Sequence, residues 1–120
     1  MIVLVDTSVW VAHFRGVVGG LVHLLENGRV VIHPVVIGEL ATGNLRNRKE
    51  TLRQLLALPR VKTETYEECL TFIESQCLYG RGIGWNDIQL LVSAKLSVAL
   101  LWTLDKRLNK ITHDLRIAYE

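Results

Sequence analysis

Four carboxylate side chains lie in separate segments of this 120-residue chain, three of them where a strand is expected to end or a helix to begin and the fourth on the helix directly after the second strand. They are Asp6, Glu39, Asp87 and Asp105. In an open parallel α/β sheet, ligands bind beyond the carboxyl ends of the strands. Carboxylates that meet at such an edge need either a proton or a metal ion, and oxygen ligands suit Mg²⁺ or Mn²⁺.

Each acid also has a purely structural interpretation when it is taken singly. The three aspartates precede predicted helices, where aspartate is a common N-cap, and Glu39 alone is simply a solvated helix residue. Two features favour a shared function. Thr7 and Ser8 directly follow Asp6, and either can cap that helix in its place. Glu39 lies in the apolar stretch Val35–Leu40, where burial of a lone carboxylate is costly.

The elements that must position these acids follow from the hydrophobic pattern. Continuous apolar runs predict buried parallel strands at Ile2–Val5 and Val98–Thr103, with shorter strands at Val30–Ile32, Val61–Thr63 and Leu115–Ala118. Helices are predicted at Val9–Arg15, Leu21–Glu26, Val35–Ala41 with Pro34 in its first turn, Leu45–Leu58, Tyr66–Leu78, Asn86–Leu96 and Lys106–Ile111, with a loop at Gly80–Gly84. Strands alternating with helices predict a single α/β domain over residues 1–120, a three-layer α/β/α fold with a central parallel sheet.

Composition excludes several other classes of protein. Hydrophobic residues make up 49% of the chain and charged residues 22%, which is typical of a globular domain and not of a disordered chain. No apolar run approaches the ~20 residues that span a membrane, and the apolar start lacks the basic region of a signal peptide. Cys69 and Cys77 would lie ~12 Å apart on one helix, too far for a disulfide. We therefore expect a cytoplasmic protein.

Four stretches of the sequence resemble, in order, the motifs of PIN-domain nucleases. They are Ile2–Trp10, Val36–Leu40, Gly82–Leu91 and Leu101–Leu108. Their order, and the 18 positions from Asp87 to Asp105, are similar to VapC-type toxins of bacterial toxin–antitoxin modules. The resemblance spans nearly the whole chain. It departs from the family after Asp105, where a further acid is common and where Lys106 and Arg107 stand here.

The resemblance implies a PIN-like, Rossmann-like fold and a Mg²⁺- or Mn²⁺-dependent endoribonuclease that leaves 5′-phosphate and 3′-hydroxyl ends. By resemblance, the four carboxylates would hold the metal ion, directly or through water. The hydroxyls of Thr7 and Thr103 would orient these acids. A cognate antitoxin protein and a homodimer are also implied, with Leu45–Leu58 as the candidate interface element.

Basic residues form a candidate RNA-binding surface. The net charge is +2, and it becomes an excess of +6 elsewhere on the chain once four acids are assigned to a metal site. The candidate phosphate contacts are Arg46, Arg48, Lys49, Arg81, Lys106 and Arg107, although a solvated helix face accounts for any one of them. Trp85 is expected in the core, with base stacking as the alternative, and the four histidines have no metal-ligand spacing.

Two other α/β classes place an aspartate after the first strand, and both are excluded. A phosphoacceptor receiver needs an aspartate near mid-chain, and none occurs between Asp6 and Asp87. A dehalogenase-type phosphatase needs an aspartate two residues after the first, where Ser8 stands. The alternative that stays open is a catalytically silent PIN-like module that binds RNA or protein.

Overall fold

The centre of the molecule is a parallel sheet of three short strands. The computed structural model describes residues 1–120. The strands are β1 (Val3–Val5), β2 (Val30–Val31) and β3 (Leu100–Trp102), in the order β2-β1-β3. Val3 lies opposite Val30 on one side and Leu100 on the other. Because the chain leaves β1 toward β2 and returns on the other side at β3, the strand order switches direction at β1.

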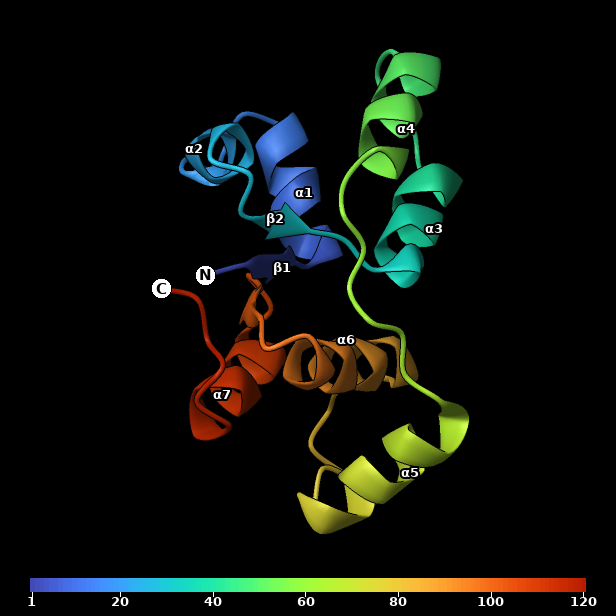
Figure 1. The fold of residues 1–120 in the computed structure, drawn as a ribbon, viewed down its shortest axis with the longest axis vertical. Coiled ribbons are helices and arrows are strands. Elements are labelled where there is room, and N and C mark those ends of the chain that lie inside the picture. The colour runs from blue at the N-terminus through green and yellow to red at the C-terminus, as the bar shows by residue number, and fades with distance from the viewer.

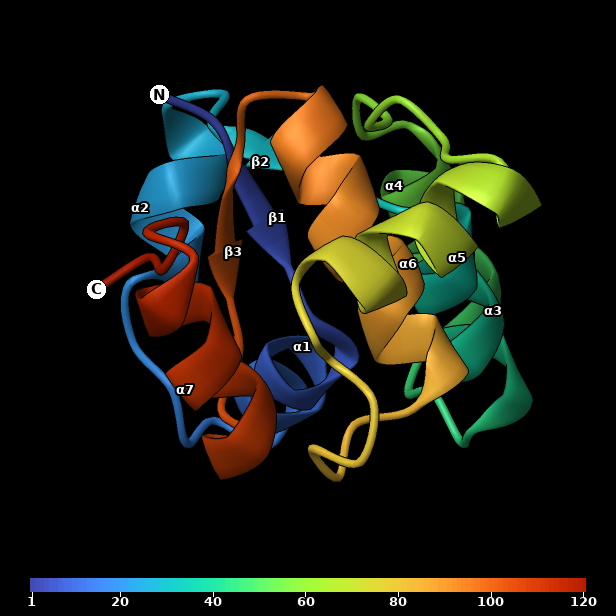
Figure 2. The ribbon, with the colours of Figure 1, turned by 90° about the horizontal axis from the view of Figure 1, so that it is seen from below.

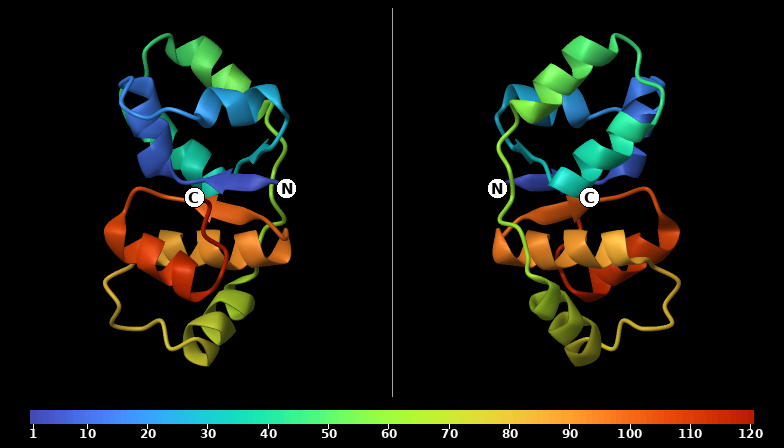
Figure 3. Two further views of the ribbon diagram at one scale, coloured as in Figure 1. Left: turned by 90° about the vertical axis from the view of Figure 1, so that its left-hand side faces the viewer. Right: turned by 90° about the vertical axis from the view of Figure 1, so that its right-hand side faces the viewer.

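Seven helices lie on the two sides of this sheet, which gives three layers (Figure 1). They are α1 (Thr7–Phe14), α2 (Leu21–Glu26), α3 (Pro34–Thr42), α4 (Arg48–Leu56), α5 (Tyr66–Ser75), α6 (Trp85–Leu96) and α7 (Lys106–Asp114). Helices α1 to α4 lie on one side of the sheet and α5 to α7 on the other, as the side views also show (Figure 3). The predicted α/β/α fold with a central parallel sheet is therefore confirmed.

The core follows from the apolar runs in the sequence. All three residues of β1 are fully buried, because helices pack on both faces of the strand. From the α6 side, β1 and β3 run side by side, and α6 and α7 flank them (Figure 2). Helix α6 contributes the largest buried face of any helix, including Ile88, Leu90 and Leu91. No helix of the structure is both long enough and apolar enough to cross a bilayer.

Two predicted strands are wrong. Val61–Thr63 is not a strand, because only Arg60 makes a bridge, parallel to Ile32. Leu115–Ala118 is likewise reduced to one bridge between Ala118 and Leu101. Both segments lie at the outer edges of the sheet, where one neighbour is missing, so short apolar stretches there do not build a continuous ladder.

Several helix boundaries also differ from the prediction. The predicted helix Leu45–Leu58 begins only at Arg48, because Asn47 adopts a left-handed conformation with φ of 50°. The helix predicted at Tyr66–Leu78 ends at Ser75, and Cys77 likewise has a positive φ of 52°. Helix α1 begins at Thr7 and α7 extends to Asp114, each longer than predicted. Cys69 and Cys77 are free thiols, as their spacing predicted.

Candidate active site

The carboxyl edge of the sheet is organised around the buried carboxylate of Asp6. Asp6 directly follows β1 and is only 7% exposed. It occupies the N-cap position of α1, but its side chain makes no capping hydrogen bond. Instead, the hydroxyls of Ser8 and Thr103 both donate to its Oδ2, each at 2.7 Å. The structural interpretation of Asp6 as a helix cap is therefore wrong, and its Oδ1 has no partner.

Ser8 and Thr103 also tie the ends of β1 and β3 together. Ser8 Oγ accepts a hydrogen bond from the backbone N–H of Leu104 at 3.0 Å. Thr103 Oγ1 accepts one from the N–H of Asp105 at 3.1 Å. The bond between Ser8 and Leu104 joins residues 96 positions apart, and the bond between Thr103 and Asp6 joins residues 97 positions apart. They fix the loop after β3 beside the start of α1, so that Asp105 is held at the same edge as Asp6.

Asp105 has both of the roles that the sequence left open. Its Oδ1 accepts the backbone N–H of Leu108 at 2.9 Å, so it is the N-cap of α7. Its Oδ2 accepts no hydrogen bond and the residue is exposed. One carboxylate oxygen therefore stabilises the helix while the other stays available at the sheet edge.

Asp87 lies near the same edge of the sheet and belongs to α6. It lies in the first turn of α6, where its Oδ2 accepts the N–H of Gly84 at 3.1 Å. Loss of hydration on burial raises the pKa of the Asp87 carboxyl. The hydrogen bond from Gly84 opposes that rise, whereas the negative charges of Asp6, Asp105 and Glu39 add to it. Asp87 therefore lies near enough to the other three acids for their negative charges to act on it.

Glu39 completes the group from α3, in the solvated environment of its structural interpretation and not in the apolar one expected from its neighbours. It is solvent-exposed despite its apolar neighbours in the sequence. The argument from desolvation is wrong, because only Val36 and Leu40 of this helix are buried and Glu39 lies on the outer face. Thr7 Oγ1 donates to Glu39 Oε1 at 2.7 Å, which links α3 to the first turn of α1.

The four carboxylates share one arrangement. In each, one oxygen accepts a hydrogen bond from the chain and the other oxygen has no partner. None of the four forms an ion pair with Lys, Arg or His in residues 1–120. In this structure no three His, Cys, Asp or Glu side chains lie together closely enough to hold a metal ion. Free carboxylate oxygens without a neutralising cation fit the binding mode of Mg²⁺, which uses one or two carboxylates and keeps several waters.

Comparisons with known proteins show which family the chain belongs to. The family model for the PIN domain matches residues 3–114. The chain belongs to the PIN-domain family. It is 43% identical over 107 residues to Ribonuclease VapC32 of Mycobacterium tuberculosis, in strains CDC 1551 / Oshkosh and ATCC 25618 / H37Rv. That match covers 88% of this chain and 86% of each relative, which confirms the resemblance to VapC-type PIN domains.

The fold is also similar to a solved structure at low sequence identity. The crystal structure of PAE2754 from Pyrobaculum aerophilum gives a TM-score of 0.62 at 18% identity. The alignment covers 92% of this PIN domain and 78% of that chain. The likeness supports the PIN-like fold alone.

The structure divides the six candidate RNA contacts of this PIN domain into engaged and free side chains. Arg81 pairs with Asp114 at 3.2 Å, and Arg48 donates to the carbonyls of Ala41 and Gly43. The side chain of Arg107 lies against Gly82, where an added Cβ would be 2.8 Å from it. Like Arg107, the remaining three, which are Arg46, Lys49 and Lys106, are exposed and have no carboxylate partner.

Two residues of the PIN domain have roles that the sequence analysis missed. Ser8 was assigned only to helix capping, yet it bonds Asp6 and the loop after β3. His33 is buried, accepts the N–H of Val35 through Nδ1, and contacts Glu64 through Nε2 at 3.0 Å. The position of His33 before Pro34 is the signal for a cap. Trp85, expected in the core, is 40% exposed and packs beside Tyr66.

Proposed function

We propose that this PIN domain is a Mg²⁺- or Mn²⁺-dependent endoribonuclease, the toxin of a bacterial toxin–antitoxin module, acting as one domain over residues 1–120. The name of the M. tuberculosis relatives, Ribonuclease VapC32, supports this activity. The observation that carries the proposal is the set of four carboxylates at one sheet edge, each with an unpartnered oxygen and none neutralised by a cation.

Each side chain has a defined part in this proposal. Asp6 would be the central metal ligand, because two hydroxyls hold its Oδ2 and leave Oδ1 free. Glu39, Asp87 and Asp105 would complete the metal site, directly or through water. When bound, the ion supplies activation of water and neutralisation of charge on the phosphodiester. Thr7 and Thr103 would orient Glu39 and Asp6, so that the carboxylates keep one geometry through the reaction.

Cleavage of purified structured RNAs with Mn²⁺, and its loss in EDTA, tests the proposal. Asp6→Asn and Glu39→Gln keep the shape of each side chain but remove its charge, so we expect both to abolish cleavage with the fold intact. Glu74→Gln is the matched control, since it removes a carboxylate from an exposed site on α5. Wild-type cleavage by either site variant would remove that residue from the metal site. No metal-dependent cleavage of any RNA by wild-type protein would favour the silent binding module.

Partners and assembly form a separate part of the proposal. We expect growth arrest on expression in the cytoplasm, relieved by co-expression of a cognate antitoxin protein. We also expect a homodimer. Helix α4 is the candidate interface element, because it buries Leu55 yet leaves Leu56 53% exposed. Light scattering at high concentration measures this directly, and a monomer there would contradict the dimer without affecting the nuclease.

A further inference from the structure

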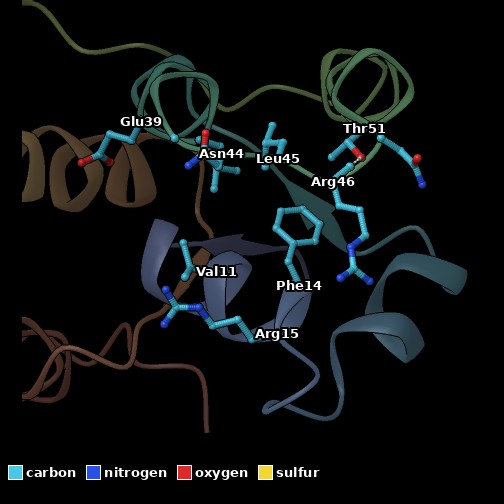
Figure 4. Close-up of a pocket in the computed structure, with 11 residues that line it drawn as sticks. Val11, Phe14, Arg15, Glu39, Asn44, Leu45, Arg46 and Thr51 are labelled. Carbon is cyan, nitrogen blue, oxygen red and sulfur yellow. Dashed lines mark hydrogen bonds between the residues drawn. The ribbon is translucent and has the colours of Figure 1, made fainter.

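A cavity beside the carboxylate site shares one residue, Glu39, with that site. It has a volume of about 830 Å³ and lies between α1 and the α3–α4 connection. Glu39 is on its wall, at one end of the lining, and Arg46 is at the other (Figure 4). The volume lies within the range of about 300–1,000 Å³ that is typical of small-ligand sites. An RNA strand with a phosphodiester at the carboxylates would therefore have this cavity beside it.

Two guanidinium groups on this wall have no partner within the protein. Arg15 directly follows α1 as its C-cap, and Arg46 lies in the connection before α4. Both are exposed, and neither side chain donates a hydrogen bond or forms an ion pair. Arg48, in contrast, has both terminal nitrogens committed to the carbonyls of Ala41 and Gly43. Unpartnered guanidinium groups are well suited to phosphate oxygens, which they bind in a bidentate manner.

Phe14 provides an aromatic surface in the same cavity. It is the last residue of α1 and is 44% exposed. Its ring points from α1 toward the α3–α4 connection (Figure 4). On the protein side, the ring is supported by Trp10 and His13, with ring centroids 5.9 Å and 5.7 Å away. A half-exposed ring held from behind is a platform on which a nucleobase can stack.

The wall opposite Phe14 is fixed before any ligand binds. Arg48 binds the last carbonyls of α3, and Thr51 Oγ1 donates to the carbonyl of Arg46 at 3.0 Å. Asn47 is held in a left-handed conformation, with φ of 50°, which an asparagine tolerates at modest cost. A rigid wall reduces the entropy lost on binding. Only four of the eleven lining residues are hydrophobic, which favours a charged strand over an amphipathic peptide.

We propose that this cavity binds one unpaired nucleotide of the RNA strand, adjacent to the phosphodiester at the four carboxylates. The base stacks on Phe14, and the flanking phosphates pair with Arg15 and Arg46. This inference rests on the proposed ribonuclease function. It makes Phe14 and the two arginines substrate-binding residues that the sequence motifs do not include.

Fluorescence anisotropy with a labelled single-stranded 12-nucleotide RNA of mixed sequence, in EDTA over a series of NaCl concentrations, tests the proposal. We expect Arg15→Gln and Arg46→Gln each to weaken binding about tenfold and to lower the salt slope by about 0.7. Phe14→Leu should weaken binding about tenfold with an unchanged slope, because stacking releases no counterions. Phe14→Tyr keeps an aromatic ring and should therefore bind the RNA with the affinity of the wild type.

A charge-matched variant and a duplex supply the controls. Lys95→Gln removes an exposed cation at the far end of α6 and should leave the affinity within about twofold of wild type. A fully paired duplex of the same sequence should bind Phe14→Leu and wild type equally, because its bases already stack on one another. Melting curves of each variant establish that it is folded.

Three results of the binding experiments would overturn the proposal. The first is that Arg15→Gln and Arg46→Gln bind the RNA as tightly as Lys95→Gln does. The second is that Phe14→Leu weakens binding of the single strand and of the duplex equally. The third is that the cavity variants bind RNA like the wild type but no longer capture the antitoxin. Cleavage with Mn²⁺ is measured separately in wild type, in Asp6→Asn and in the cavity variants Phe14→Leu, Arg15→Gln and Arg46→Gln. Cleavage that depends on Asp6 but not on the cavity variants would refute the cavity and keep the nuclease. RNA binding that depends on the cavity without any cleavage would refute the nuclease instead.

Discussion

Replacement of Asp87 with asparagine removes one of the four negative charges at the sheet edge. It keeps a side-chain oxygen that can accept the N–H of Gly84. Burial and the charges of Asp6, Asp105 and Glu39 raise the pKa of this carboxyl despite that hydrogen bond. The first turn of α6 would by itself favour a negative charge, by about 0.3–1 kcal/mol. The raised pKa means that the unfavourable effects are larger. We therefore expect Asp87→Asn to stabilise the metal-free protein at neutral pH.

The expected size of the effect follows from the length of the chain. Because the side chain is only half-buried, solvent screening limits the gain to about 0.2–1 kcal/mol. For 120 residues, the entropy of unfolding is about 0.25 kcal/mol per kelvin, so this gain raises Tm by about 1–4 °C. Free metal ion at a hundredfold above its Kd should stabilise the wild type by about 2.7 kcal/mol, or about 11 °C. Asp87→Asn should reduce that metal-induced rise.

The dependence on pH gives an independent check. A group whose folded pKa is raised contributes stability that is present below its unfolded pKa and lost as pH rises through the folded value. The wild-type protein should therefore lose stability relative to Asp87→Asn as pH rises from about 3.5, below the ordinary aspartate pKa, toward neutrality. At the acid end the two melting temperatures should coincide.

The assay is a set of melting curves for wild type, Asp87→Asn and the control Glu74→Gln, each in EDTA and in Mn²⁺. Glu74→Gln should move neither the metal-free Tm nor the metal-induced rise, since Glu74 is exposed on α5. A lower Tm for Asp87→Asn in EDTA, together with a full metal-induced rise, would show that Asp87 only caps α6. The reasoning about charge repulsion would then be refuted.

Three further substitutions test the structural parts of the site. His33→Ala should lower the free energy of unfolding, measured by urea denaturation, by about 2–4 kcal/mol, because it removes a helix cap and leaves the 7%-exposed Glu64 side chain without its partner. A loss below about 1 kcal/mol would contradict this. Asp105→Ala should cost about 1 kcal/mol more than Asp105→Asn, which keeps the cap of α7, and equal stabilities would argue against the cap. Gly82→Ala should cost about 1–2 kcal/mol, because φ is +80° and its Cβ would meet Arg107; in an Arg107→Ala background the steric part of that cost should disappear.

The sequence determined the elements that lie deepest in the molecule. The run around Val3–Val5 predicts a strand buried on both faces, and it is the fully buried centre of the sheet. The period of Asn86–Leu96 likewise predicts α6 within one residue. Hydrophobic pattern is a strong signal there because burial on every side leaves little choice of conformation. At the edges, as in Val61–Thr63, the same pattern does not tell a paired strand from an extended segment.

The sequence also determined which residue types were available for chemistry, and the four acids could be named from it. Only the tertiary structure decided what each one does. Asp6 and Asp105 both precede helices, but Asp105 caps its helix whereas Asp6 is turned away to Ser8 and Thr103. Thr103 lies 97 residues away from Asp6 in the sequence. Its contact depends on the pairing of β1 with β3, and no local pattern can report a hydrogen bond between strands so distant along the chain.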